Sequence, residues 1–112
     1  MPASKNLEDS RKFVTMTAQH HEWELNADED LVNLLLNGLM VNYNRYGYFL
    51  CPCRDGHGVR EEDQDIICPC AYCEPDQQEY GHCYCGLYLT PEFFASDQET
   101  HPIPERRPQG SQ

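Results

Sequence analysis

Three Cys-x-Cys pairs limit what this chain of 112 residues can fold into. The pairs are Cys51-Pro52-Cys53, Cys68-Pro69-Cys70 and Cys83-Tyr84-Cys85, and the seventh cysteine, Cys73, follows the second pair. All seven thiols fall within residues 51–85, so this segment has to fold around them. Six paired thiols are two more than a tetrahedral metal site or a four-iron cluster uses. The surplus favours a metal centre with a redox-active dithiol beside it.

The overall charge argues against two classes of partner. The chain carries 8 lysines and arginines against 19 aspartates and glutamates, which gives a formal net charge of −11. Binding to nucleic acid needs a basic surface, and so does attraction to anionic lipid. No apolar run reaches the length that spans a membrane. We therefore expect neither a nucleic acid nor a membrane as a partner.

The expected compartment decides how the cysteines are interpreted. Residues 1–22 are polar and charged, which is unlike a secretory signal peptide. Without a secretion signal, many cysteines favour metal binding or catalysis over a disulfide framework. An odd number of cysteines also leaves at least one thiol outside any scheme made only of disulfides. We therefore predict a cytoplasmic location and disfavour a pure disulfide scaffold.

The first part of the chain predicts an all-α fold. A first helix is expected over residues 5–22, capped by Ser4 or Asn6. A second helix is expected over 28–46, because capping and acidic residues stand at its start and Gly47 marks its end. This second helix has an apolar stripe at helical spacing, formed by Leu31, Leu34, Leu35, Gly38 and Leu39.

The second part of the chain predicts a loop-rich region around the cysteines. Short helices are expected over 59–66 and 75–80, and the apolar residues 87–89 are expected to pack over a buried centre. Residues 96–112 are polar and rich in proline, so they cannot form a core. We therefore divide the chain into a single small domain over 1–95 and an extended tail that lies on it.

Proline stands in the middle of the first two cysteine pairs and affects where their thiols point. It fixes the backbone angle φ and removes an amide donor, so the two flanking side chains tend to point apart. One thiol of a pair can then face a metal while the other faces elsewhere. A single pair can in this way contribute to two different functions.

Zinc is the main alternative to this interpretation. Cys70 and Cys73 form a Cys-x-x-Cys step, and Cys83, Cys85 or His82 can complete a site with four ligands. The chain would then be a zinc-stabilised interaction module without catalysis. This alternative leaves Cys51, Cys53 and Cys68 unexplained.

In these motifs the chain resembles the catalytic chain of ferredoxin:thioredoxin reductase. That family carries two Cys-Pro-Cys motifs followed by a Cys-His-Cys motif. The first motif matches over residues 48–54, the second over 67–70 and the third over 82–91. The resemblance runs from about residue 5 to residue 95, and the two helices predicted before the first motif suit the family's layout.

The resemblance implies a role for each paired cysteine. Both thiols of the second pair, with one thiol from each of the other pairs, would ligate a 4Fe–4S cluster, which gives the ligand set Cys51, Cys68, Cys70 and Cys83. The two remaining thiols, Cys53 and Cys85, would form a redox-active disulfide next to the cluster. Cys53 would attack the substrate disulfide, and Cys85 would stay with the cluster.

The resemblance also implies the reaction. The chain would be an iron–sulfur disulfide reductase that takes electrons from a ferredoxin-like donor and reduces a thioredoxin-like protein. A ferredoxin delivers single electrons, whereas a disulfide takes two, so a cluster that touches one sulfur can hold the half-reduced state. The chain can act alone, as a homodimer or with a second subunit.

Several features add to the family pattern or depart from it. Tyr84 stands where the family has a histidine that helps to move protons, and His82 and His57 are the candidates to replace it. Cys73 is an extra thiol, which we expect to be inert. Arg54 follows the exchange thiol, where a cation would lower that thiol's pKa, although a surface arginine fits equally. The strong acidity would repel an acidic ferredoxin, so the donor can differ from the plant donor.

Overall fold

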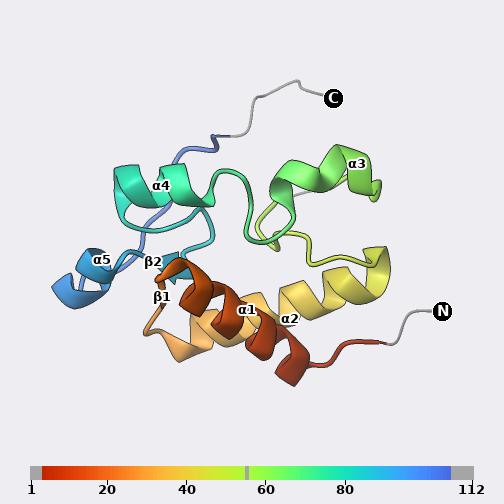
Figure 1. Cartoon of the computed structure of the whole chain (residues 1–112), viewed down its shortest axis with the longest axis horizontal. Helices are drawn as coiled ribbons and strands as arrows, with labels where there is room; N and C mark the ends of the chain where they lie inside the picture. The colour runs from red at the N-terminus through yellow and green to blue at the C-terminus, as the bar shows by residue number, and fades with distance from the viewer. Residues whose placement is uncertain (1–3, 55, 107–112) are drawn as a thin grey trace.

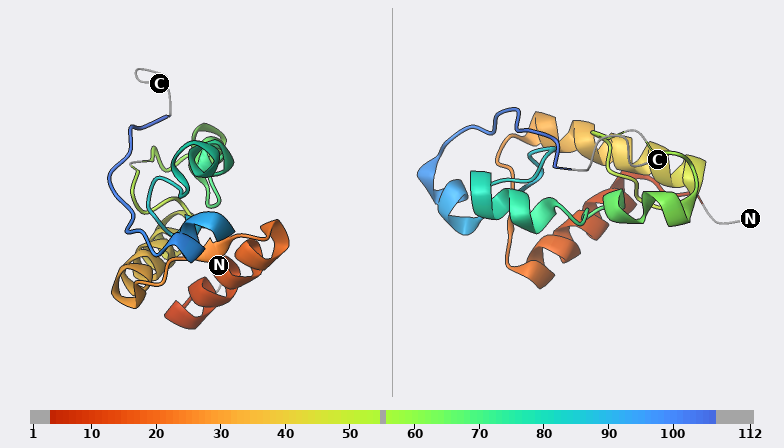
Figure 2. Two further views of the ribbon diagram at one scale, coloured as in Figure 1. Left: turned by 90° about the vertical axis from the view of Figure 1, so that its left-hand side faces the viewer. Right: turned by 90° about the horizontal axis from the view of Figure 1, so that it is seen from above.

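The computed structural model describes residues 4–54 and 56–106, and its helices form two layers (Figures 1 and 2). One layer consists of α1 (Leu7–His21) and α2 (Glu29–Tyr46). The other contains α3 (Arg60–Asp63), the 3-10 turn η1 (Gln64–Ile66) and α4 (Cys73–Tyr80). The remaining elements are the strands β1 (Glu24–Leu25) and β2 (Tyr88–Leu89) and the helix α5 (Pro91–Ser96). The predicted mostly helical fold is confirmed, with a small sheet that the sequence did not predict.

Helix α1 begins at a capping box. The Asn6 side chain accepts a hydrogen bond from the Asp9 backbone at 2.9 Å, and the Asp9 carboxylate accepts one from the Asn6 backbone at 2.9 Å. These two bonds satisfy amide donors that a helix start otherwise leaves free. The helix buries Val14 and Ala18 on one face. The first predicted helix is therefore confirmed, with Asn6 as its cap.

Helix α2 runs from the Asp28 cap to Gly47, whose φ of 87° ends it in the left-handed region, as predicted. Its buried side differs from the predicted stripe, because the core-facing residues are Val32, Leu35, Leu36 and Leu39. Leu34 is wrong as a core residue, since it is 68% exposed. Three consecutive leucines at 34–36 allow two overlapping stripes, and only packing against α1 and the cysteine segment selects one.

Gly38 lies where α2 passes closest to the first cysteine pair. A Cβ atom built at this position would lie 2.7 Å from the Cβ of Pro52, which is closer than such atoms pack. Glycine therefore allows the helix backbone and the Cys-Pro-Cys loop to approach each other. Leu36 and Leu39 of the same helix belong to one apolar cluster with Cys68 and Cys83, so the helical layer supports the cysteine segment directly.

The layer that contains α3 and α4 combines a small apolar cluster around Ile66 with the polar contacts of Asp63. The carboxylate of Asp63 is fully buried and accepts hydrogen bonds from the Tyr48 hydroxyl at 2.6 Å and from the His57 and Gly58 amides at 2.9 and 3.1 Å. These bonds close the loop that follows the first cysteine pair. Both short helices predicted in this layer are confirmed, and α4 begins earlier than expected, at Cys73.

The chain after the third cysteine pair returns to the helical layer. Strand β2 pairs antiparallel with β1, with Glu24 opposite Leu89 and Leu25 opposite Tyr88. Helix α5 follows, with Thr90 as its cap and proline in its first turn. This helix was not predicted, although a threonine followed by a proline is a recognisable start of a helix.

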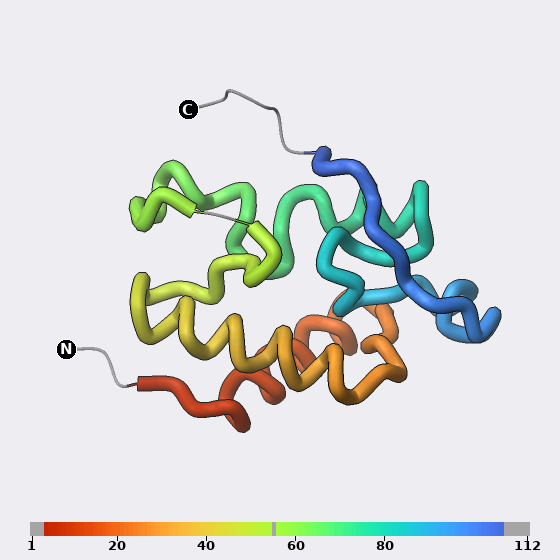
Figure 3. The backbone as a smooth tube through the Cα atoms, turned by 180° about the vertical axis from the view of Figure 1, so that it is seen from behind, coloured from red at the N-terminus to blue at the C-terminus, as the bar shows by residue number. Residues whose placement is uncertain are grey.

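The described part of the tail, residues 97–106, extends along the surface of the domain (Figure 3). Ile103 anchors it, because its side chain is buried against the domain. Arg106 adds an ion pair to Asp76 at 2.8 Å and a second one to Glu79, both on α4. Residues 107–112 of the predicted tail lie outside the described residues.

Candidate functional site

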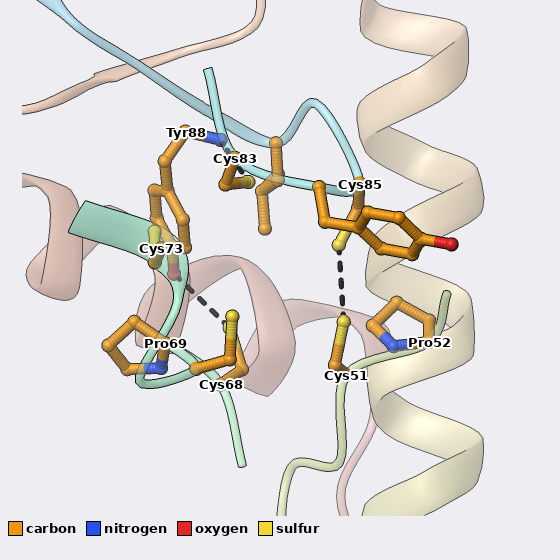
Figure 4. A pocket seen from close by; sticks show the side chains of 11 residues that line it. Cys51, Pro52, Cys68, Pro69, Cys73, Cys83, Cys85 and Tyr88 are labelled. Carbon is orange, nitrogen blue, oxygen red and sulfur yellow. Dashed lines mark hydrogen bonds between the residues drawn. The ribbon is translucent and has the colours of Figure 1, made fainter. Parts of the chain in front are cut away.

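Six of the seven cysteines line one pocket (Figure 4). The cysteines that line it are Cys51, Cys68, Cys70, Cys73, Cys83 and Cys85. The other lining residues are Pro52, Pro69, Tyr84, Leu87 and Tyr88, so none of the described residues contributes a carboxylate, imidazole or amine to the lining. Thiols in apolar surroundings are the donor set of iron–sulfur clusters and of structural zinc. The lining therefore fits a thiolate-bound metal centre.

The first and second cysteine pairs are held side by side by backbone hydrogen bonds. The Cys51 amide donates to the Ile66 carbonyl at 2.9 Å, and the Cys68 amide donates to the Phe49 carbonyl at 2.7 Å. An isolated antiparallel bridge between Leu50 and Ile67 lies between these two bonds. The apolar residue before each pair thus fixes the position of the cysteine that follows it.

The third pair lies on a turn closed against β2. The Cys83 amide donates to the Tyr88 carbonyl at 3.0 Å, and the Gly86 amide donates to the Cys83 carbonyl at 2.9 Å. Gly86 adopts a φ of 78°, a left-handed conformation that favours glycine. This turn brings Cys83 and Cys85 to the pocket from the side opposite the first two pairs (Figure 4).

The two thiols of the first pair point to different surroundings. Cys51 is buried and lines the pocket, whereas Cys53 is exposed and does not. This is the divergence that the central proline predicts, but the same prediction is wrong for the second pair, because Cys68 and Cys70 both line the pocket. Of the seven cysteines, Cys53 is the most exposed, while Cys70 and Cys85 are partly buried and the other four are buried. A reagent or protein outside the molecule can therefore reach Cys53 more readily than any other thiol.

Cys85 lies between the pocket and the exposed thiol. Its sulfur is 3.4 Å from the sulfur of Cys51, and interactions with the Cys53 and Cys83 thiols also raise its pKa. The hydrogen bond with Cys51 is the main reason why the pKa of Cys85 is raised and that of Cys51 lowered. Cys53 and Cys85 are free thiols in the structure, so the disulfide predicted for the oxidised protein stays a prediction.

The buried sulfur atoms of Cys68 and Cys83 both contact Tyr88, which follows the third pair. The Tyr88 hydroxyl lies 3.6 Å from the sulfur of Cys68, and the Tyr88 amide donates to the sulfur of Cys83 at 3.4 Å. Burial raises the pKa of Cys68 well above its ordinary value. A hydrogen bond with Cys73 is the main reason why the pKa of Cys83 is lowered. Tyr88 therefore connects the second and third pairs, a role that the sequence analysis did not anticipate.

Cys73 lines the pocket, where only the zinc alternative had placed it beside Cys70. Its side chain is buried, and its sulfur accepts a hydrogen bond from the side-chain amide of Gln77 at 3.3 Å. The Cys83 thiol interacts with it and raises its pKa. Cys73 and Gln77 are four residues apart, and residues at this spacing lie on one face of a helix. This spacing could have indicated that the two side chains contact each other. That Cys73 is chemically inert stays a prediction.

Arg54 directs its guanidinium to the sulfur atoms of two pocket cysteines. Its side chain is buried, and one guanidinium nitrogen donates to the sulfur of Cys70 at 3.1 Å and to that of Cys51 at 3.8 Å. Burial raises the pKa of Cys70 to about 11, against the lowering effect of Arg54. The interpretation of Arg54 as a surface residue is therefore wrong, and its action on Cys53 stays a prediction. Arg54 lies in a turn in which its amide donates to the Cys51 carbonyl at 3.3 Å, and its guanidinium extends to the pocket sulfurs.

The residue at the family's histidine position is engaged with this arginine. The Arg54 guanidinium lies over the Tyr84 ring, 4.4 Å from its centroid. Of the two candidate replacements, His82 is fully buried and both ring nitrogens meet backbone groups, the Cys83 carbonyl at 2.8 Å and the His101 amide at 3.4 Å. His82 therefore has no free nitrogen for the dithiol. His57 is exposed, and its amide binds Asp63.

Two further observations concern metals and membranes. Within residues 4–54 and 56–106, no three histidine, cysteine, aspartate or glutamate side chains are arranged to hold one metal ion.

None of the helices in these ranges combines the length and apolar character needed to cross a lipid bilayer.

Comparison with known proteins identifies relatives along most of the chain. The sequence matches the family model described as ferredoxin thioredoxin reductase catalytic beta chain over residues 1–106. It is 34% identical over 97 residues to the ferredoxin-thioredoxin reductase catalytic chain of Porphyra purpurea, which covers 84% of this chain and 79% of the relative. The chloroplastic catalytic chain of Arabidopsis thaliana is 31% identical over 101 residues, 87% of this chain and 66% of the relative. A chloroplastic catalytic chain of Spinacia oleracea is 30% identical over 109 residues, which cover 95% of this chain and 71% of the relative.

These relatives decide what kind of protein the chain is. The plant relatives are chloroplastic, which differs from the cytoplasmic location expected from the sequence. The resemblance seen in the three cysteine motifs is confirmed by the match over residues 1–106 and by the identities of about 30%. The chain belongs to the ferredoxin–thioredoxin reductase catalytic beta chain family, whose members are oxidoreductase enzymes.

Proposed function

We propose that this chain is an iron–sulfur disulfide reductase that takes electrons from a ferredoxin-like donor and reduces a disulfide of a thioredoxin-like protein. The names of its relatives contain both partners, and the catalytic-chain name implies an assembly with another subunit. One observation carries the proposal: Cys85 lines the cysteine pocket 3.4 Å from the sulfur of Cys51, and the pKa of Cys85 is raised in part by the exposed thiol of Cys53. A thiol pair in this position can exchange electrons on one side and disulfides on the other.

The proposed ligands of the 4Fe–4S cluster are Cys51, Cys68, Cys70 and Cys83. All four line the pocket, and the apolar lining would keep water from the iron. The backbone contacts between the first two pairs and the turn of the third would hold these sulfur atoms in place. When bound, the cluster would accept single electrons and supply them to the neighbouring disulfide.

Cys53 and Cys85 form the proposed redox-active pair. Two electrons and two protons convert their disulfide to two thiols. The exposure of Cys53 suits the role of nucleophile towards another protein, because disulfide exchange needs access as well as thiolate. The position of the partly buried Cys85 beside Cys51 suits the role of the thiol that remains at the metal centre.

The exchange with the substrate then takes two steps that balance. The Cys53 thiolate attacks one sulfur of the substrate disulfide, which forms a mixed disulfide and releases the other substrate sulfur as a thiolate. The Cys85 thiolate next attacks the sulfur of Cys53. This second step restores the Cys53–Cys85 disulfide and releases the substrate as a dithiol.

The zinc alternative is weaker after these observations. One of its proposed ligands, His82, has both ring nitrogens against backbone groups. The other members of that set would also leave Cys51 and Cys68 in the pocket without a role. A catalytic family relationship further argues against a module without catalysis.

Trapping the mixed disulfide tests the order of the two thiols. With an oxidised thioredoxin, the Cys85→Ser variant is expected to accumulate an adduct at Cys53, because the resolving thiol is missing. The Cys53→Ser variant is expected to form no adduct, and both variants are expected to keep their iron and lose nearly all turnover. Cys73→Ser is the matched control and is expected to keep both iron and activity. Adducts at Cys85 instead of Cys53 would reverse the two roles.

A further inference from the structure

The tail strap, residues 101–106, lies across the side of the molecule that carries the cysteine loops (Figure 3). The buried side chain of Ile103 holds its middle, the His101 amide meets His82, and Arg106 binds Asp76 on α4. Between these anchors, Glu105 reaches back to the first cysteine pair. It forms a salt bridge with Arg54, a residue 51 positions earlier in the chain.

The contact between Glu105 and Arg54 is bidentate. The Nε atom of Arg54 donates to one carboxylate oxygen at 2.7 Å, and its Nη2 atom donates to the other oxygen at 2.7 Å. Two parallel hydrogen bonds of this kind fix the orientation of the guanidinium plane as well as its position. The third nitrogen, Nη1, is thereby directed to the sulfur atoms of Cys70 at 3.1 Å and Cys51 at 3.8 Å.

Aromatic rings close the remaining sides of this guanidinium. Its central carbon lies 4.4 Å from the centroid of the Tyr84 ring and 5.3 Å from that of Tyr72. The Arg54 side chain is only 2% exposed. A buried cation is stable only where it is paired and hydrogen-bonded, and here Glu105 supplies the pairing charge. Without Glu105, the free energy of burying Arg54 would rise, and the guanidinium would move towards water.

We propose that Arg54 is a positioning residue of the redox centre, held on the sulfur atoms of Cys70 and Cys51 by Glu105 of the tail strap, and that it favours electron uptake there. The inference rests on the proposed function for its electronic part. Hydrogen bonds to cluster sulfurs and nearby charge set the reduction potential of an iron–sulfur centre. A protein of net charge −11 disfavours an additional electron, so a buried cation at two ligand sulfurs acts in the opposite direction.

Trypsin tests the strap without requiring a metal. Trypsin cleaves after arginine only when the side chain is free to enter its specificity pocket, so the buried Arg54 is protected while the exposed Arg60 serves as an internal reference. In Glu105→Gln and Glu105→Ala, cleavage after Arg54 relative to cleavage after Arg60 is expected to rise on the order of tenfold, because a charge-assisted buried pair is lost. Glu99→Gln removes the same charge from an exposed tail position and is expected to leave the ratio unchanged.

The midpoint potential of the purified full-length protein tests the electronic part. Arg54→Gln is expected to bind its cluster and to shift the potential to more negative values, and Arg54→Lys, which keeps the charge but not the fork, is expected to shift it less. Glu105 variants are not used for this measurement, because loss of a negative charge by itself raises the potential while release of Arg54 lowers it.

The two readouts separate the possible failures. An unchanged trypsin ratio in both Glu105 variants would overturn the strap, and an unmoved or more positive potential in Arg54→Gln would overturn the electronic role. An iron-free wild-type protein would overturn the proposed function together with that electronic role, whereas the trypsin ratio would still decide on the strap.

Discussion

The helical layer and the cysteine segment of this protein are held together in different ways. Helices α1 and α2 have side-chain caps and share one apolar cluster, so their stability comes from neighbouring residues and from packing against each other. In the described residues of the cysteine segment, 48–54 and 56–90, the regular elements are short helices and a strand of two residues. This segment packs its apolar residues against α2 and in a small cluster around Ile66, and it is further held by isolated backbone bonds, the buried Asp63 and contacts between sulfur atoms.

This difference indicates which region depends most on a bound metal centre for its stability. A small domain buries a modest core, so additional cross-links contribute a large share of its stability. In this chain the pocket thiols come from three separate loops, and ligation would join all of them. We therefore expect the helical layer to form without a metal and the cysteine segment to depend on one.

Removal of the cluster should produce the largest effect. After chelation and reduction, we expect the near-ultraviolet circular dichroism signal and the cooperative melt to be lost, because the three cysteine loops are no longer joined. Part of the far-ultraviolet helical signal should remain, since the apolar faces of α1 and α2 do not use the cysteines. An unchanged cooperative melt would show that the two regions do not differ in this respect.

Truncation of Leu36 tests how much apolar packing stabilises the helical layer. Leu36 is completely buried on α2, so Leu36→Ala should lower the free energy of unfolding by about 2–5 kcal/mol. Leu34→Ala is the matched control on the same helix, and its exposed side chain should change that free energy by less than about 0.5 kcal/mol. Denaturant unfolding of the loaded protein measures both, and equal effects would contradict the assigned core face.

Replacement of Asp63 tests the polar support of the cysteine segment. Asp63→Asn should destabilise the protein by about 1–3 kcal/mol, because the amide replaces an acceptor of three hydrogen bonds. Burial opposes ionisation, but the hydrogen bonds from His57, Tyr48 and Gly58 lower the pKa of Asp63 below its ordinary value.

The lowered pKa gives this contribution a defined dependence on pH. The stabilisation should be complete above the unfolded-state pKa of about 3.9 and should disappear as the pH falls through the lower folded-state pKa. The difference in stability between Asp63→Asn and the unmutated protein should therefore shrink below about pH 4. A difference that grows on acidification would contradict the assignment, and stability curves from pH 2 to pH 7 provide the measurement.

Loss of the α1 cap should have the smallest effect of the four. Asn6→Ala removes one half of the capping box and should cost about 1 kcal/mol, measured by thermal unfolding. Asn6→Gly, which keeps an acceptable cap conformation, should cost only a few tenths of that amount. A loss of iron on either substitution would mean that the helical layer and the metal site are coupled more tightly than proposed.

The parts of the fold that local sequence determines were predictable. Asn6, Asp28 and Gly47 are capping signals read within one turn of the chain, and the helices they bound are confirmed. The divergence of Cys51 and Cys53 was expected from the proline between them, although the same motif places both Cys68 and Cys70 at the pocket. The family resemblance led us to expect thiols of all three pairs at one site, and the pocket brings five of these six thiols together.

The parts that depend on distant contacts were not predictable. Leu34 and Leu35 carry the same side chain, and only packing distinguishes the exposed one from the buried one. The direction of Arg54 depends on Glu105, which is 51 residues away and carries no motif. The sheet pairs residues more than 60 positions apart, and each of its strands has only two residues, too few for a periodic pattern.

Iron and acid-labile sulfide content of the anaerobically purified protein tests the central claim most directly. A 4Fe–4S cluster on the cysteine pocket predicts about four iron and four sulfide per chain, with brown colour and broad absorbance in the blue. In this account Cys68→Ser loses both, while Cys73→Ser keeps them. A colourless protein with about one zinc per chain and no sulfide would contradict the account and would support the zinc alternative.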